Sequence, residues 1–372
     1  MKSLTNTPSE SNRIIGLDIL RSFAILLVLL QHGQFIVHDS KITRYFTQLF
    51  NLVDGVSIFF VLSGFLIGKI IINQFITNST SFKTLYYFWL KRWLRTLPNY
   101  FLILLIFAIL YHFNSSLDFL DIPKSYYFFL QNTQVNEIVN FKESWSLSVE
   151  EWFYFSFPLV LFLGLKIGSK KYSKLIFVLV LMAYLIIPLF LRLQIQYFDI
   201  NFDFRKIVIY RLDAIIYGVL AAYISTYFQE IWSKNKITFL FFGILIFVLI
   251  ILNPANWKVV YSPIYYSIES IGIVLFFPFF ASLENLKWTS VNSFFKFISS
   301  ISYSLYLVNL TLVQMVCLPY INQVFKSSNF SKSSSELMLY TLFWIISISI
   351  STLLYYAFER PILNWRNRII SE

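Results

Sequence analysis

Residues Ile14 to Val37 read IIGLDILRSFAILLVLLQHGQFIV. About 20 predominantly apolar residues are enough to cross the ~30 Å core of a bilayer, so this run predicts a membrane-spanning helix. It is interrupted by Asp18, Arg21 and His32, and ionisable groups at the centre of a bilayer cost roughly 2.5 to 3.5 kcal/mol each unless they face a bundle interior or a water-filled cavity. Arg21 and His32 are eleven residues apart, which returns them to nearly the same helix face about 16 Å apart along the axis. One wall of the predicted interior therefore carries a fixed cation and a proton-transfer group.

The rest of the chain has the same apolar character. Its 372 residues are 57% hydrophobic, 20% aromatic and 13% charged, and apolar runs recur along the whole length. This composition is typical of an all-α polytopic membrane protein rather than a water-soluble domain. The net charge of +11 does not indicate a nucleic-acid partner, because the basic residues lie between apolar runs and not in one patch.

Ten segments are long and apolar enough to be predicted as membrane-spanning helices. They are Ile14 to Val37, Leu52 to Ile72, Thr96 to Phe113, Trp145 to Lys166, Lys174 to Leu193, Arg205 to Phe228, Ile237 to Asn253, Ile264 to Leu283, Phe294 to Leu318 and Leu337 to Ala357. The first span carries charges and lacks the clean apolar region of a signal peptide, so we expect it to remain uncleaved.

Lysine and arginine predict the orientation of the helices. Ten spans place both termini on one side, and of the 30 Lys and Arg residues 17 fall on that side and seven on the other. Loops that face the cytoplasm carry an excess of these residues. We therefore predict a cytoplasmic tail over residues 1–13, one membrane domain over residues 14–357 and a second cytoplasmic tail over residues 358–372.

Disulfide and metal chemistry are not expected. The single cysteine, Cys317, lies within an apolar run, where a small hydrophobic role fits best. The three histidines are scattered along the sequence, which argues against a structural metal site.

The fourth predicted span begins with acidic residues in ESWSLSVEEWFYFSFP. In the predicted orientation Glu150 and Glu151 lie about 8 to 9 Å from the outer end of this span, a depth similar to that of His32. A carboxylate beside a histidine orients the imidazole and raises its basicity, which makes one of the two glutamates a candidate partner for His32. The alternative is that both glutamates are interfacial residues that reach out of the membrane.

Two further charged motifs have both a structural and a functional interpretation. In FWLKRWLRTLPNY, Arg92 and Arg95 are three residues apart on one helix face, interleaved with tryptophans. They suit either a membrane anchor or a phosphate site, since guanidinium groups bind phosphate bidentately. In IYRLDAIIYG, Arg211 and Asp213 suit either a functional pair or mutual neutralisation for helix packing.

Taken together, seven segments resemble, in order, the membrane-bound acyltransferase type 3 family along nearly the whole chain. They are LDILRSFAILLVLLQH, GVSIFFVLSGFLIG, KRWLRTLPNY, SWSLSVEEWFYFSFP, YRLDAIIYG, ISYSLYLVN and FERPI. The resemblance implies a multi-pass enzyme of the bacterial inner membrane. Such an enzyme takes an acyl group, usually acetyl, from cytoplasmic acyl-CoA and passes it to a hydroxyl of a glycan or lipid-linked glycan.

The resemblance also implies roles for individual residues. The catalytic residues would be His32, Glu150 and Glu151. The donor would bind through Arg21, Arg92 and Arg95, and the supporting residues would be Asp18, Ser148, Arg211 and Asp213.

The chain departs from the family pattern at two positions. The segment YSLYLVN ends in Asn309, where many members have histidine, which weakens any second proton-transfer role there. Ser57 stands where the family often has an acid, and Asp54 is the nearest carboxylate. We also expect no soluble hydrolase-like domain after the last helix.

With the donor that the resemblance implies, we expect acyl-CoA to dock its phosphates on the arginines and to extend its pantetheine arm toward His32. His32 would then either deprotonate the acceptor hydroxyl or accept the acyl group itself. We expect the acceptor to bind at the outer mouth, which includes the loop from Asn114 to Ser144. Two rival functions are a secondary transporter that exports a lipid-linked sugar, for which no paired repeat is evident, and a non-catalytic scaffold, which leaves the buried charges unexplained.

Overall fold

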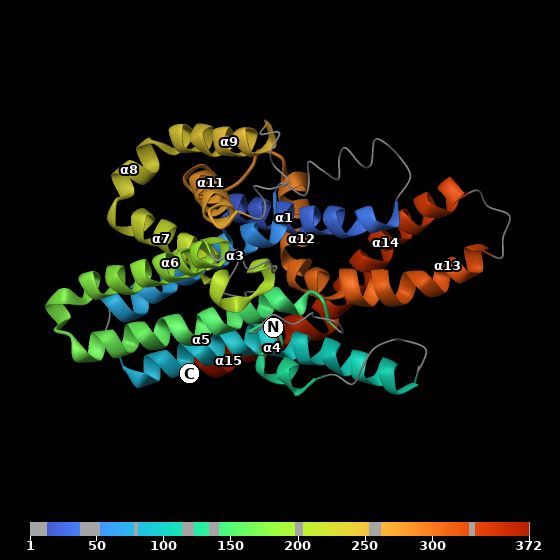
Figure 1. Ribbon diagram of the computed structural model, residues 1–372, viewed down its shortest axis with the longest axis horizontal. Coiled ribbons are helices and arrows are strands. Elements are labelled where there is room, and N and C mark those ends of the chain that lie inside the picture. Colours follow the sequence, from blue (N-terminus) through green and yellow to red (C-terminus); the bar gives the residue numbers. More distant parts are fainter. Residues whose placement is uncertain are drawn as a thin grey trace, which may run out of the picture.

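The computed structural model describes residues 13–37, 53–77, 81–113, 123–133, 141–197, 204–252, 262–326 and 332–371. Every regular element in these ranges is a helix, and Figure 1 shows the long helices packed side by side. The predicted N-terminal tail lies outside the described residues except for Arg13, and so does about half of the predicted acceptor loop.

Seven helical stretches are long and apolar enough to cross a membrane, which confirms an all-α multi-pass protein. They are Ile15–Ile36, Gly55–Thr77, Phe82–Leu110, Ser144–Ile167, Lys170–Tyr197, Thr289–Gln323 and Ser334–Ile369. Three shorter apolar helices, Leu212–Tyr227, Lys236–Leu252 and Tyr265–Phe280, coincide with the other three predicted spans. The count of ten spans and the side of the termini stay predictions.

The chain order of the main helices is simple. It runs α1 (Ile15–Gly33), α3 (Gly55–Ile71), α4 (Phe82–Phe113), α5 (Ser144–Ile167), α6 (Ser173–Tyr197), α7 (Leu212–Tyr227), α8 (Gln229–Lys234), α9 (Lys236–Leu252), α11 (Tyr265–Phe280), α12 (Thr289–Val308), α13 (Leu318–Lys326), α14 (Lys332–Leu354) and α15 (Arg360–Ser371). Three π-helical segments extend these helices: η2 (Ile72–Thr77) follows α3, η7 (Asn309–Cys317) joins α12 to α13, and η8 (Tyr355–Glu359) joins α14 to α15. Segments of π-helix occur often at functional sites.

Helices α1, α3 and α12 form the centre of the bundle. Helix α1 packs against both α3 and α12, and α3 packs against α7. In the view of Figure 1 these central helices lie between α9 and the group formed by α4, α5 and α15. Charged motifs from distant parts of the sequence are therefore brought to one interior.

Glycines bring the backbones of α3 and α7 into direct contact. A Cβ atom added to Gly64 would lie 1.8 Å from the carbonyl oxygen of Ile215, and one added to Gly218 would lie 2.0 Å from that of Val61. Small residues permit such close approach between helices in a membrane, where packing replaces the hydrophobic effect as the force that holds helices together.

The residues after the last predicted span are helical. Predicted as a tail from residue 358, this segment forms the end of η8 and all of α15, and α15 packs against α4. The guanidinium of Arg366 donates to the carbonyl oxygen of Lys91 at 3.3 Å, which ties α15 to the beginning of α4.

Candidate active site

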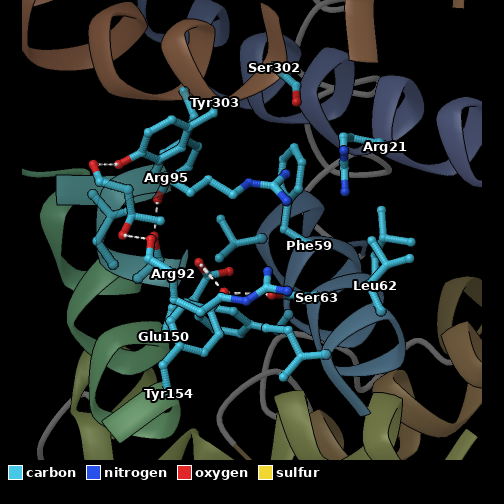
Figure 2. Close-up of a pocket in the computed structure, with 18 residues that line it drawn as sticks. Arg21, Phe59, Leu62, Ser63, Arg92, Arg95, Glu150, Tyr154, Ser302 and Tyr303 are labelled. Atoms are coloured by element: carbon cyan, nitrogen blue, oxygen red, sulfur yellow. Dashed lines mark hydrogen bonds between the residues drawn. The ribbon is translucent and has the colours of Figure 1, made fainter. Parts of the chain in front are cut away.

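Three arginines from two helices face one cavity. Arg21 of α1 and Arg92 and Arg95 of α4 line it, and Figure 2 shows their side chains directed into the same space. The cavity holds about 820 Å³ of space that no atom occupies, part of it open to solvent. Within the described part of the chain, no carboxylate lies within ion-pair distance of these three guanidinium groups. The cavity therefore presents an excess of positive charge, which favours an anion.

Glu150 is the acidic group of this cavity. Its Oε2 accepts a hydrogen bond from the Tyr154 hydroxyl at 3.0 Å, and the same hydroxyl lies 2.7 Å from Ser63 Oγ. Since the Tyr154 proton goes to the carboxylate, Ser63 donates to Tyr154. Glu150 also interacts electrostatically with all three arginines of the cavity.

Glu151 and Ser148 lie outside the cavity. The Thr96 hydroxyl donates to Glu151 Oε1 at 2.6 Å, which ties α4 to α5, and both residues are buried. The hydroxyl of Ser148 donates to the carbonyl oxygen of Ser144 in its own helix. The two adjacent glutamates thus point to different surroundings, as the 100° step of a helix requires.

The predicted pairing of His32 with Glu150 or Glu151 is not present in the structure. His32 Nδ1 instead lies 2.5 Å from the side-chain oxygen of Asn309 at the start of η7. Glu150 instead lies in the cavity with the arginines, and Glu151 lies against Thr96. The relative depth of neighbouring helices, which their sequences alone do not specify, decides which side chains meet. Asn309, at one of the two positions where the chain departs from the family pattern, is therefore the partner of His32.

The amide of Asn309 decides which nitrogen of His32 carries the proton. Its nitrogen donates to the carbonyl oxygens of Leu305 and Tyr306, both at 2.9 Å, so its oxygen must be the atom that faces His32. The flipped amide would place that oxygen against two carbonyl oxygens. Nδ1 is therefore the donor, and Nε2 of the neutral imidazole keeps its lone pair.

Three residues that line the cavity lie within one helical turn of residues near His32 or η7. Tyr306 of α12, Val56 of α3 and Ser146 of α5 line the cavity. Within one helical turn of them lie, in the same order, Asn309, Asp54 and Glu143. Asn309 is hydrogen-bonded to His32, and Asp54 interacts electrostatically with His32. His32 itself does not line the cavity; its partner Asn309 lies one helical turn beyond Tyr306, which does.

Arg211 and Asp213 are not paired with each other, contrary to the prediction. Asp213 is bound by Arg192 of α6, whose Nη1 and Nη2 donate to the two carboxylate oxygens at 2.9 and 2.6 Å. Arg211 instead donates to Ser57 Oγ at 2.8 Å and lies 3.6 Å from Asp54. Arg211 precedes the first residue of α7 with a non-helical backbone, whereas Asp213 lies within α7. Each of the two residues is paired with a charged group from another part of the bundle.

Asp54 is the carboxylate that lies beside Arg211 and Ser57. Ser57 Oγ donates to Asp54 Oδ2 at 3.1 Å, and Ser57 in turn accepts from Arg211. The carboxylate of Asp54 also caps α3 by accepting the amide proton of Val56 at 3.0 Å. Ser57 therefore bridges an arginine and an acid that stands three residues upstream.

Asp18 faces α12 and not the cavity. Arg13 binds it through two hydrogen bonds of 2.6 and 2.9 Å, and Ser299 Oγ donates to it at 2.6 Å. This cluster joins the beginning of α1 to α12, one turn below Arg21.

Several residues of these networks are not expected from the sequence patterns, among them Asn309 as the partner of His32, Arg192, Glu143 and Glu269, whose Oε1 accepts the amide proton of Asp54 at 2.8 Å. Arg192 was the easiest to find, because it is an arginine within a predicted span and is fully buried in the structure. Glu143 precedes α5 and is 1% exposed; burial raises its pKa to about 7, whereas hydrogen bonds from Thr311 act in the opposite direction by favouring the ionised form. Among the described residues, no group of three or more His, Cys, Asp and Glu side chains could hold a metal ion.

Comparisons with known proteins agree with these observations. The acyltransferase domain model of the type 3 family matches residues 14–358. A Staphylococcus aureus protein (strain MRSA252) named "Putative O-acetyltransferase" is 26% identical over 394 residues, which cover 96% of this chain and 59% of the relative. A Listeria monocytogenes protein named "Peptidoglycan O-acetyltransferase OatA" is 27% identical over 165 residues, which cover 41% of this chain and 24% of the relative.

The chain spans about three fifths of the length of the Staphylococcus relatives that it matches. No solved protein structure matches it significantly. The family match covers nearly the whole membrane domain, including the arginine cavity and His32. The chain has seven helices long and apolar enough to cross a membrane, and it belongs to the type 3 acyltransferase family.

Proposed function

We propose that this protein moves an acetyl group from cytoplasmic acetyl-CoA to a hydroxyl of a surface glycan or lipid-linked glycan, in the inner membrane of a bacterium. The names of its relatives support O-acetylation, and one of them supports a cell-wall glycan as acceptor. The excess of basic residues on the predicted cytoplasmic side supports entry of the donor from that side.

The arginine cavity is the observation that carries this proposal. Acetyl-CoA has several phosphate charges, and Arg21, Arg92 and Arg95 offer three guanidinium groups that form no ion pair with a carboxylate of the described residues. Apolar walls that include Phe59, Leu62 and Leu66 suit the pantetheine arm. The distance from Arg21 to His32 along α1 is about 16 Å, comparable to that arm in an extended form.

His32 acts as the general base in the proposed reaction. Its Nε2 takes the proton of the acceptor hydroxyl while the hydroxyl oxygen attacks the thioester carbonyl. The carbon–sulfur bond then breaks, and the departing CoA thiolate takes up the proton that His32 holds. Asn309 keeps Nε2 free for this task, because it engages Nδ1. A positioned base contributes typically 10² to 10⁴ in rate, and binding of both substrates must supply the rest.

Transport of a lipid-linked sugar would also use buried arginines. Membership of an acyltransferase family favours group transfer. Purified protein should release CoA thiol from acetyl-CoA in an acceptor-dependent manner, whereas a transporter would leave the thioester intact.

The role of His32 is tested by substitution. His32→Ala should lower kcat at least about 10²-fold with folding intact, because a general base is lost. The control is His112→Ala, an exposed histidine at the end of α4, which should keep wild-type activity. If His32→Ala retains more than about a tenth of the wild-type rate, His32 is not the base.

The acceptor is tested in cells. A strain that lacks this protein should lose O-acetyl signals from the NMR spectrum of a surface polysaccharide, and the signals should return with the wild-type gene but not with His32→Ala. Unchanged spectra in the deletion strain would contradict a glycan acceptor.

A further inference from the structure

Glu143 is a buried acid that the proposed reaction does not use. It precedes α5 and binds the first residues of η7 on the other side of the interior. Its Oε1 accepts the amide protons of Leu310 at 2.9 Å and Thr311 at 2.7 Å, and its Oε2 accepts the hydroxyl proton of Thr311. Three donors around one acid favour the carboxylate form and hold it in place.

These bonds occur where the helix changes from α12 to η7. In an uninterrupted α-helix the amide of Leu310 would donate to the carbonyl oxygen of Tyr306. Here the amide donates to Glu143, and the carbonyl oxygen accepts from the side chain of Asn309. Glu143 thus accepts the amide proton that lacks its helical acceptor, and Asn309 donates to the carbonyl oxygen that lacks its helical donor. A buried backbone group without a partner is costly, so this turn depends on the two side chains together.

The same turn carries the partner of His32. Asn309 reaches His32 Nδ1 only because its amide nitrogen is held by the carbonyl oxygens of Leu305 and Tyr306. The backbone of the next two residues is in turn held by Glu143. A continuous set of hydrogen bonds therefore runs from Glu143 through η7 and Asn309 to the imidazole.

We propose that Glu143 is a positioning residue that stabilises the α12–η7 turn and thereby fixes His32 as the tautomer with its proton on Nδ1. The inference rests on the proposed role of His32 as the base. Without Glu143 the turn relaxes toward a regular α-helix, Asn309 rotates away, and the proton of the imidazole distributes between Nδ1 and Nε2. The fraction of His32 that can act through Nε2 then falls.

The tautomer can be observed directly, whether or not the protein is active. The chain has three histidines, so His38→Gln with His112→Gln leaves His32 alone. Solid-state NMR of ¹⁵N-histidine-labelled protein distinguishes a protonated ring nitrogen from an unprotonated one. The background protein should show a single tautomer with Nδ1–H, and adding Glu143→Ala should produce a mixture. A spectrum that Glu143→Ala leaves unchanged would overturn the inference.

Kinetics provide the second readout. Glu143→Ala should lower kcat by about 10- to 100-fold, because small misplacements of a catalytic group are costly, and KM for acetyl-CoA should stay unchanged. Glu143→Gln should restore most of the activity, since its oxygen still accepts from both backbone amides. Asn309→Ala should match Glu143→Ala, and the double variant should be no slower than either single variant, because the two residues act as one unit. Independent, multiplicative losses would contradict this unit.

Two controls separate the possible failures. Glu230→Ala removes an exposed glutamate of α8 and should change neither the spectrum nor kcat. If Glu143→Ala does not fold, Glu143→Asp withdraws the carboxylate by one methylene and should show the same changes to a smaller degree; a folded Glu143→Asp with wild-type spectrum and kcat would overturn the inference. If the background protein transfers no acetyl group, the proposed function fails while the NMR result still stands.

Discussion

His32 is paired with a neutral amide, and this differs chemically from pairing with an acid. A carboxylate partner orients an imidazole and also raises its basicity, whereas an amide oxygen orients it and selects the tautomer without adding a charge. Asp54, which interacts electrostatically with His32, adds negative charge from α3 without the hydrogen bond. Orientation and charge thus come from two different residues, Asn309 and Asp54.

The donor site is tested at the two arginines of α4. Arg92→Ala with Arg95→Ala should raise KM for acetyl-CoA at least about tenfold, because each guanidinium offers charge-assisted hydrogen bonds to phosphate. The affinity for the acceptor should stay unchanged. The control is Lys91→Ala, an exposed cation of the same helix.

If the two arginines serve only as a membrane anchor, the double variant will fail in insertion or orientation, as reporter fusions would show, while the correctly inserted fraction will keep a wild-type KM.

The adjacent glutamates of α5 should respond differently to neutralisation. Glu150 shares the cavity with the arginines, so Glu150→Gln removes a negative charge from the proposed phosphate site. The substitution should lower KM for acetyl-CoA by about three- to tenfold, from about 1 kcal/mol of repulsion. Glu151→Gln should leave KM unchanged, because Glu151 faces Thr96. Equal effects of the two substitutions on KM would refute this division. The measurement is initial-rate kinetics with varied acetyl-CoA.

At the scale of elements, contacts between helix backbones set the geometry of the site. Helix α3 carries Asp54 and Ser57, α7 follows directly after Arg211, and the two helices touch through Gly64 and Gly218. The π-helical segment η7 has a comparable role, because it presents Asn309 at the end of α12. These elements explain why an ion pair between α3 and the start of α7 forms next to the histidine.

Gly218→Ala tests the close packing of α3 and α7. The added methyl would lie 2.0 Å from the carbonyl oxygen of Val61, which is backbone and cannot rotate away. We expect a loss of about 1 to 3 kcal/mol in the free energy of unfolding, the usual cost of overpacking.

The matched control is Gly164→Ala in α5, where the added methyl would meet only a side-chain atom of Ile176 at 2.9 Å. Thermal unfolding of detergent-solubilised protein measures both variants. Equal stability of the two would show that the α3–α7 contact is looser than the structure indicates.

At the scale of the whole molecule, the proposed reaction requires that the arginines and His32 face opposite sides of the membrane. The positive-inside distribution predicts that the arginine end faces the cytoplasm. Donor and acceptor would then approach the cavity from opposite sides of the membrane. A protein that spans the membrane can bind substrates from both sides, whereas a protein bound to one surface cannot.

Cysteine labelling tests this orientation in a Cys317→Ser background. Single cysteines at positions 38–44 and at Lys142 should react with an impermeant thiol reagent from outside, and cysteines at Ile167 and Lys170 should be protected until the membrane is opened. Lys142, Ile167 and Lys170 are chosen because they are exposed, whereas the neighbours of Lys142 are buried. Labelling of Ile167 and Lys170 from outside would invert the topology and exclude the cytoplasmic donor.

The sequence by itself determined the class of structure and the set of charged residues. Apolar runs of sufficient length must become helices in a bilayer, because no water is present there to satisfy an open backbone, and a helix of known period places Arg92 and Arg95 on one face. Buried charges such as Arg21 and His32 are recognisable in sequence because they are expensive in lipid.

Only the tertiary structure decided which of these groups meet. Arg192 binds Asp213, Arg211 lies beside Asp54, and Asn309 rather than a glutamate holds His32. Partners on different helices depend on the depth and rotation of each helix. Depth and rotation depend in turn on glycine contacts, which set how closely two helices approach, and on π-helical turns. Each π-helical turn shifts the register of the residues that follow it. The sequence pattern gives the angle of a side chain about its own helix axis, and the packed bundle fixes what that side chain faces.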